Sequence, residues 1–169
     1  IIALWIKLDS PGPVLFRQRR VGRDRTHFNI LKFRTMRGDT PHDVPTHLLK
    51  NPDSYITKSG AFLRKTSLDE LPQFFNVLKG DMSLVGPRPE IPFHVEHFKE
   101  EIPRYLVRQQ VRPGCTGWAQ VNGLRGDTDI AERIRYDIWY IENWTVALDI
   151  KIIFRTVFGG KMVNDEKLT

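Results

Sequence analysis

The chain has 169 residues, of which 40% are hydrophobic and 11% aromatic, and its formal net charge is +6. A chain of this size and composition folds as one globular domain and buries about 70% of its unfolded surface, so it needs neither disulfides nor a structural metal. The single cysteine, Cys115, excludes an internal disulfide, and no Cys and His residues have zinc-site spacing, which favours a reducing, cytoplasmic setting.

The first eight residues are apolar except for Lys7. They are too few to span a bilayer, which takes about 20 residues, and they lack a signal-peptide pattern. We therefore expect them to be the end of a longer apolar segment, so that residues 1–169 form one domain that is truncated at its N-terminus. The Ser-Pro-Gly-Pro run at residues 10–13 ends this segment in a turn.

Residues 14–21 and 26–36 flank the short run Gly-Arg-Asp-Arg, which predicts a β-hairpin. Residues 15–37 contain eight cations and one carboxylate, so the basic charge of the chain is one patch. Such a patch suits a nucleic-acid backbone, anionic lipid or a phosphorylated small substrate, and the alternative is a merely solvated strand face. The cations are Arg17, Arg19, Arg20, Arg23, Arg25, Lys32, Arg34 and Arg37.

A loop is predicted for residues 38–58, where His42 and His47 have no companions that would make a metal site. Two adjacent carboxylates, Asp69 and Glu70, then precede Pro72. Such a pair can divide the work of phosphoryl transfer, with one carboxylate attacking phosphorus and the other holding a divalent cation.

The same residues also fit a helix-capping box, in which Ser67 caps the backbone and Glu70 returns a hydrogen bond. Pro72 argues against a helix that begins at Ser67, because proline removes an N–H within the first turns. We expect the helix to begin near Pro72 and to run to Gly80, with Asp69 at its N-terminal side, where anions are stabilised. Spacing alone leaves both interpretations open.

Further helices are predicted at residues 92–102 and from the capping signal at Asp129 through an isoleucine stripe. Residues 146–158 form a last, strongly apolar helix that ends at two glycines; it is either a core helix or one that lies in a membrane interface. The chain has no dinucleotide-binding glycine motif and no P-loop. The predicted fold is α+β and mostly helical, with a small basic β-hairpin and several amphipathic and interfacial helices around the carboxylate pair.

Six stretches, taken in order, resemble the bacterial sugar transferase family, the monotopic polyprenyl-phosphate phosphoglycosyl transferases, and the members similar to this chain are the undecaprenyl-phosphate glucose and galactose phosphotransferases. The stretches cover nearly the whole chain. They are KLDSPGPV (7–14), FRQ (16–18), KFRTM (32–36), LRKTSLDELPQ (63–73), GDMSLVGPRP (80–89) and RPGCTGWAQVNG (112–123). The family carries a re-entrant membrane helix before the first stretch, and only its last turns correspond to this chain.

The resemblance implies an enzyme at the cytoplasmic face of the bacterial inner membrane. It would transfer a sugar 1-phosphate from a UDP-sugar to a polyprenyl (undecaprenyl) phosphate and release UMP, which starts exopolysaccharide, capsule or O-antigen synthesis. Asp69 would form a covalent aspartyl intermediate, and Glu70 would bind Mg2+, the implied cofactor. The other implied site residues are Lys32, Arg34 and Arg88, which would bind substrate phosphate, and Asp137, a further acid of the site.

The implied partners are the two substrates and a membrane surface with anionic lipid, with room for a homo-oligomer and no role for nucleic acid. Two other classes of function compete. A nucleic-acid-binding module would use the arginines with Phe16, Phe28 and Phe33 as stacking surfaces, and a non-catalytic membrane scaffold would use the arginines on lipid. Neither alternative needs Asp69 beside Glu70.

Overall fold

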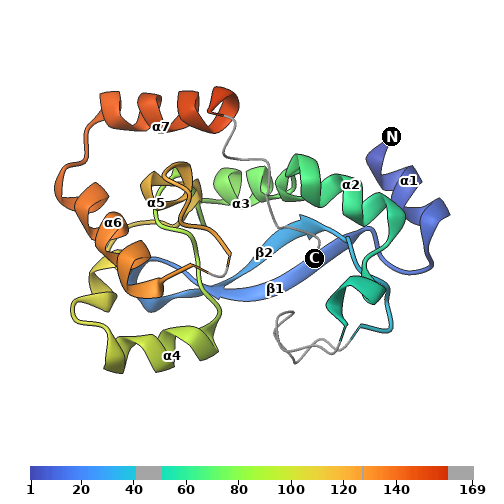
Figure 1. The fold of residues 1–169 in the computed structure, drawn as a ribbon, viewed down its shortest axis with the longest axis horizontal. Coiled ribbons are helices and arrows are strands. Elements are labelled where there is room, and N and C mark those ends of the chain that lie inside the picture. The colour runs from blue at the N-terminus through green and yellow to red at the C-terminus, as the bar shows by residue number, and fades with distance from the viewer. Residues whose placement is uncertain (41–50, 127, 160–169) are drawn as a thin grey trace.

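The computed structural model describes residues 1–40, 51–126 and 128–159 (Figure 1). His42 and His47, in the predicted loop, lie outside these ranges. The described elements are α1 (Ile2–Asp9), β1 (Leu15–Val21), η1 (Arg23–Arg25), β2 (His27–Phe33), η3 (Pro52–Tyr55), α2 (Lys58–Thr66), η4 (Leu68–Glu70), α3 (Gln73–Lys79), β3 (Ser83–Val85), α4 (Pro92–Glu101), η5 (Tyr105–Gln109), β4 (Gly114–Thr116), α5 (Trp118–Val121), α6 (Ile130–Glu142) and α7 (Val146–Phe158), where η is a 3-10 helix. The α+β, mostly helical fold is confirmed.

The predicted basic hairpin is confirmed. β1 pairs with β2 in antiparallel register, from Leu15 opposite Phe33 to Val21 opposite His27. The hairpin crosses the middle of the molecule, with α1, α2, α3 and α7 on one side of it and α4 on the other (Figure 1). The elements that carry the candidate catalytic residues are packed around this hairpin.

Helix α1 is held against α2 by polar and aromatic contacts. Asp9 accepts hydrogen bonds from both the backbone N–H and the hydroxyl of Ser59, each at 2.8 Å, and the rings of Trp5 and Phe62 lie 5.4 Å apart. At Gly60 an added Cβ would meet the carbonyl oxygen of Thr35 at 2.0 Å, so only glycine lets α2 lie this close to the hairpin's exit.

The predicted start of a helix near Pro72 is confirmed, because α3 begins at Gln73 with Pro72 as its N-cap and ends at Gly80, where φ is 84°. The capping-box alternative is wrong: Ser67 is left-handed at φ 57° and makes no side-chain capping bond to the turn that follows it. Asp69 and Glu70 therefore lie in η4, a separate short turn between α2 and α3. Asn76 docks α3 on β2, accepting a hydrogen bond from the Leu31 N–H at 3.0 Å.

A second, parallel strand pair, β3 with β4, was not predicted. Cys115 is the middle residue of β4. Three glycines make this pairing possible, because an added Cβ would meet backbone atoms at 2.6 Å from Gly86, 2.1 Å from Gly114 and 2.3 Å from Gly117. The pair fixes the backbone immediately before Arg88.

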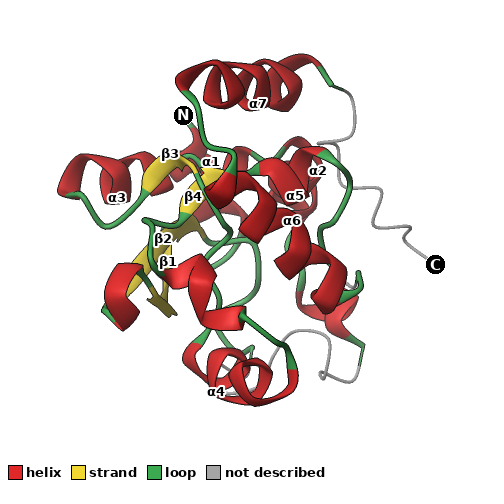
Figure 2. Cartoon of the chain, turned by 90° about the vertical axis from the view of Figure 1, so that its left-hand side faces the viewer, coloured by secondary structure: helices red, strands yellow, loops and turns green. Residues whose placement is uncertain are grey.

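Helix α6 connects two hydrophobic clusters. Ile134 and Ile138 pack in the first, with Val95 of α4, while Tyr140 packs in the second, with Ile152 of α7. The predicted C-terminal helix is confirmed with its end at Gly159. Figure 2 shows α7 at one end of the molecule and α4 at the opposite end. In the described part of the chain no helix is both long enough and apolar enough to cross a bilayer.

Candidate active site

Glu70 is the centre of a compact charged cluster. Its Oε1 accepts hydrogen bonds from Lys32 Nζ at 2.9 Å and from Arg88 Nη2 at 2.7 Å. Arg125 Nη2 lies 4.0 Å from the other carboxylate oxygen. Burial opposes ionisation of Glu70, but Arg88 and Lys32 outweigh it and hold the pKa of this carboxyl well below its usual range. Glu70 is therefore a fixed negative charge.

Asp69, the neighbouring carboxylate, has the opposite electrostatic character. Burial raises its pKa and the charge of Glu70 adds to this effect, while Lys32 opposes both. Two adjacent carboxyls whose pKa values are pushed apart suit two different tasks. The raised pKa gives Asp69 the greater basicity, and nucleophilicity generally rises with basicity, whereas Glu70 keeps its charge to organise the surrounding cations.

Lys32 and Arg88 reach Glu70 from separate parts of the chain. Lys32 comes from β2, and Arg88 follows β3 between Pro87 and Pro89, which keep that segment extended. Burial lowers the pKa of Lys32, whereas Glu70 raises the pKa of Arg88. The sequence-predicted phosphate ligands Lys32 and Arg88 are thus brought together with the carboxylate pair.

Arg125 is a member of the cluster that the sequence analysis did not single out. It follows α5 after Gly123, whose φ is 89°, and its side chain is 16% exposed. It lies in the loop between α5 and α6. No local pattern places an arginine of this loop beside Glu70, because the approach depends on how α5 and α6 pack.

The structure does not bring Arg34 into this cluster. Its guanidinium donates to the carbonyl oxygens of Pro13 at 2.6 Å, Pro11 at 3.0 Å and Ser10 at 2.8 Å. It also donates to the hydroxyl of Ser10 at 2.7 Å. These contacts make Arg34 a clamp that holds the turn between α1 and β1, and its role in binding phosphate stays a prediction.

Asp137 lies behind the cluster. It is 2% exposed, and its Oδ2 forms an ion pair with Arg108 Nη2 at 2.8 Å. Burial raises the pKa of Asp137, and Arg108 opposes that shift. The structure places this acid in the core next to the site, where it does not contact Glu70.

The residues present fit Mg2+ held jointly with a substrate. Among the described residues no three His, Cys, Asp or Glu side chains come together as a metal site. Mg2+ is usually bound by one or two carboxylates together with substrate phosphates, and the hard oxygens of Asp69 and Glu70 match that donor set. Cys115, whose pKa burial raises to about 11, offers no thiolate at neutral pH.

The carboxylate pair, with Lys32, Arg88 and Arg125 gathered at Glu70, has the charge and geometry that suit an anionic substrate. The chain belongs to the bacterial sugar transferase family, whose model matches residues 1–162.

Relatives with established names are similar over nearly all of this chain. The UDP-glucose:undecaprenyl-phosphate glucose-1-phosphate transferase of Escherichia coli is 52% identical over 163 residues, which is 94% of this chain and 35% of that protein. The protein of the same name from Caulobacter vibrioides is also 52% identical, over 93% of this chain and 60% of its own length. The UDP-N-acetylgalactosamine-undecaprenyl-phosphate N-acetylgalactosaminephosphotransferase of Aeromonas hydrophila is 48% identical, over 92% and 37%. The chain therefore spans between about a third and three fifths of these relatives.

Proposed function

We propose that this chain is the catalytic part of a phosphoglycosyl transferase. It takes a sugar 1-phosphate from a UDP-sugar and gives it to a polyprenyl (undecaprenyl) phosphate, yielding a polyprenyl diphosphate sugar and UMP. The observation that carries the proposal is the Asp69–Glu70 pair enclosed by three cations. The names of three relatives that are 48–52% identical, all sugar-phosphate transferases that act on undecaprenyl phosphate, support it.

The reaction would proceed in two displacements at one phosphorus. An Asp69 carboxylate oxygen attacks the β-phosphorus of the UDP-sugar, the new O–P bond forms, and the bond to the UMP oxygen breaks with its electron pair leaving on UMP. An oxygen of the polyprenyl phosphate then attacks the same phosphorus and releases the Asp69 carboxylate. Each step exchanges one O–P bond for another, so no oxidant or reductant is needed.

The cations would stabilise the charge that develops in both steps. Arg88 presents a planar fork that suits phosphate oxygens, and Lys32 adds a point charge from the hairpin. Arg125 adds a third positive charge on the far side of Glu70. Mg2+ held by Glu70 and the substrate would neutralise further phosphate charge. Glu70 also keeps Lys32 and Arg88 in place between turnovers.

We further propose that the domain sits in the interface of the cytoplasmic face of the inner membrane. Exposed apolar side chains gather on the elements of one side of the hairpin, including Leu4 and Leu8 of α1, Phe75 and Leu78 of α3, and Ile150, Ile153, Phe154 and Val157 of α7. Two cations of the same helix α7, Lys151 and Arg155, lie over the ring of Trp118 of α5. Cationic side chains together with a tryptophan suit the depth of the lipid headgroups.

An assay with the full-length protein in membranes tests the reaction. Undecaprenyl phosphate and a panel of UDP-sugars, including UDP-glucose, UDP-galactose and UDP-N-acetylgalactosamine, should give UMP with at least one sugar. Excess EDTA should stop release, and added Mg2+ should restore it, because neutralising the diphosphate requires a divalent cation. Absence of UMP with every sugar would exclude the proposed reaction, and full rates in EDTA would exclude the role of Mg2+.

Membrane docking can be tested with vesicles. The protein should bind vesicles that contain anionic lipid more tightly than neutral ones, and affinity should fall as salt rises. Phe154→Glu on α7 should weaken binding about tenfold or more, because an exposed aromatic ring that would enter the membrane interface is replaced by a charge. Phe93→Glu, on α4 at the other end of the molecule, is the matched control and should have no effect. Equal effects of the two variants, or sequence-selective nucleic-acid binding without vesicle binding, would contradict this proposal.

A further inference from the structure

A buried cluster of four charged side chains lies behind the candidate active site. Glu90, Arg108, Arg133 and Asp137 are each no more than 9% exposed. Charges are costly to bury unless they are paired and hydrogen-bonded, so each must be held by specific partners. The reaction proposed above assigns no step to any of the four.

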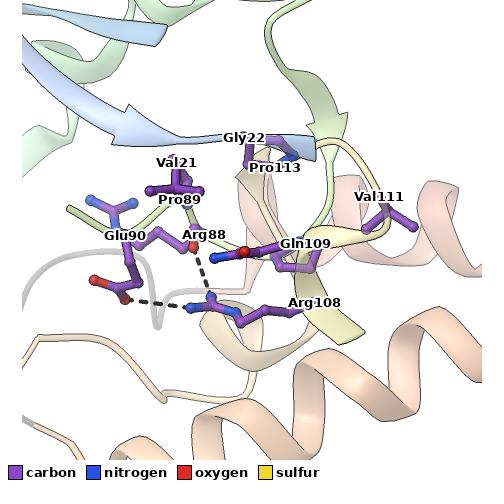
Figure 3. Close-up of a pocket in the computed structure, with 10 residues that line it drawn as sticks. Val21, Gly22, Arg88, Pro89, Glu90, Arg108, Gln109, Val111 and Pro113 are labelled. Atoms are coloured by element: carbon purple, nitrogen blue, oxygen red, sulfur yellow. Dashed lines mark hydrogen bonds and ion pairs between the residues drawn. The ribbon is translucent and has the colours of Figure 1, made fainter. Parts of the chain in front are cut away.

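Arg108 joins this cluster to the backbone of Arg88. Its Nη2 lies 2.8 Å from Asp137 Oδ2 and donates to the Arg88 carbonyl oxygen at 2.7 Å. Its Nη1 donates to the hydroxyl of Tyr105 at 3.3 Å and lies 3.9 Å from Glu90 Oε1. Figure 3 shows the guanidinium of Arg108 between Glu90 and the main chain of Arg88. One guanidinium therefore connects an acid of α6 to the segment that presents Arg88.

Arg133 makes the corresponding connection to the loop that carries Arg125. Its Nη1 donates to Glu90 Oε1 at 3.3 Å, while its Nη2 donates to the carbonyl oxygen of Gly126 at 2.6 Å and to the hydroxyl of Thr128 at 3.1 Å. Gly126 has φ of 59° and directly follows Arg125. Both Arg88 and Arg125, which converge on Glu70, are thus attached to the buried cluster. Arg108 holds Arg88 by its own carbonyl oxygen, and Arg133 holds the carbonyl oxygen of the residue that follows Arg125.

We propose that Glu90, Arg108, Arg133 and Asp137 form a positioning device that fixes the main chain at Arg88 and beside Arg125, so that both guanidinium groups converge on the substrate phosphates. The assignment of phosphate as their ligand rests on the proposed function. Asp137 is then a positioning residue: it orients Arg108, and Arg108 holds Arg88. Glu90 connects the two halves, because it accepts a hydrogen bond from Arg133 and forms an ion pair with Arg108, so one network places both Arg88 and Arg125.

Arg108→Lys is the first test, made in the full-length protein in membranes. Lysine keeps a positive charge opposite Asp137 but lacks the fork that also reaches the Arg88 carbonyl. We expect kcat/KM for a UDP-sugar that the wild type uses to fall about 10- to 100-fold, since small displacements of a substrate-positioning group have effects of this size. Amides of Gly86, Arg88 and Glu90 should also exchange hydrogen faster.

Arg104→Lys is the matched control, because Arg104 also pairs with an acid of α6, Glu142, but at the surface. It should leave both rate and exchange unchanged. If Arg108→Lys does not fold, Asp137→Asn, which keeps an acceptor of the same shape, should give the same loosening of residues 86–90.

A double-mutant cycle separates positioning from general support of the fold. Once Arg88→Ala has removed the guanidinium, adding Arg108→Lys should cost clearly less activity than it costs in the wild type, because Arg108 contacts Arg88 directly and reaches the Arg125 loop only by way of Glu90 and Arg133. Additive losses, or hydrogen exchange at residues 86–90 that matches the wild type, would overturn the proposal. If the wild type transfers no sugar phosphate at all, the proposed function fails, and the exchange comparison alone still decides whether the network holds this segment.

Discussion

Asp69→Asn is expected to lower UMP release by about 10³-fold or more, because an amide cannot attack phosphorus as a carboxylate does. The variant should keep the wild-type melting temperature, since asparagine has the same shape and Asp69 lies in the short turn η4. UMP release in membranes containing the full-length protein measures the effect. Asp24→Asn, at an exposed left-handed position in the hairpin turn, is the control and should have full activity.

The same variant tests the covalent route. Brief exposure of the wild type to labelled UDP-sugar without polyprenyl phosphate should leave sugar phosphate on the protein, and this label should be absent from Asp69→Asn. Steady-state kinetics with both substrates should be ping-pong. Near wild-type turnover by Asp69→Asn would show that Asp69 is not the nucleophile, and intersecting initial-rate patterns with no adduct at short times would exclude the intermediate.

Glu70→Gln is expected to lower kcat by about 10²- to 10³-fold while the protein stays folded. Glutamine keeps an oxygen near Lys32 and Arg88 but carries no charge to hold them or to bind Mg2+. Turnover at saturating UDP-sugar, with circular dichroism as the check on folding, is the measurement. Glu101→Gln, which removes an exposed charge beside His97, is the matched control. A change in KM alone would mean that Glu70 serves only ground-state binding.

Local patterns predicted the elements whose signals are local. The hairpin followed from two extended runs around a glycine turn, α3 from the position of Pro72, and α7 from an apolar run closed by Gly159. β3 and β4 could not be found in this way, because each has only three residues and no alternation. Their pairing depends on Gly86 and Gly114 meeting across a long stretch of chain, and the sequence shows the glycines but not which backbone they approach.

Family motifs indicated which residues belong near the site but not what each one contacts. Lys32 and Arg88 do reach Glu70, whereas Arg34, from the same motif as Lys32, is directed to the carbonyls of the α1–β1 turn. Asp137 is close to the site only through Arg108. A family motif contains both residues that contact the substrate and residues that hold those residues in place. Its presence in a sequence therefore does not show which of the two roles a given residue has.

The contact between β3 and β4 limits how this site could change its specificity. Where Gly86, Gly114 and Gly117 meet, a single methyl group would have to displace main chain, and the displaced segment leads directly to Arg88. Substitutions of these three glycines would therefore not yield a variant that uses a new donor sugar. In a laboratory evolution experiment for a new donor, we expect substitutions in the loop that carries Arg125, while the three glycines stay unchanged.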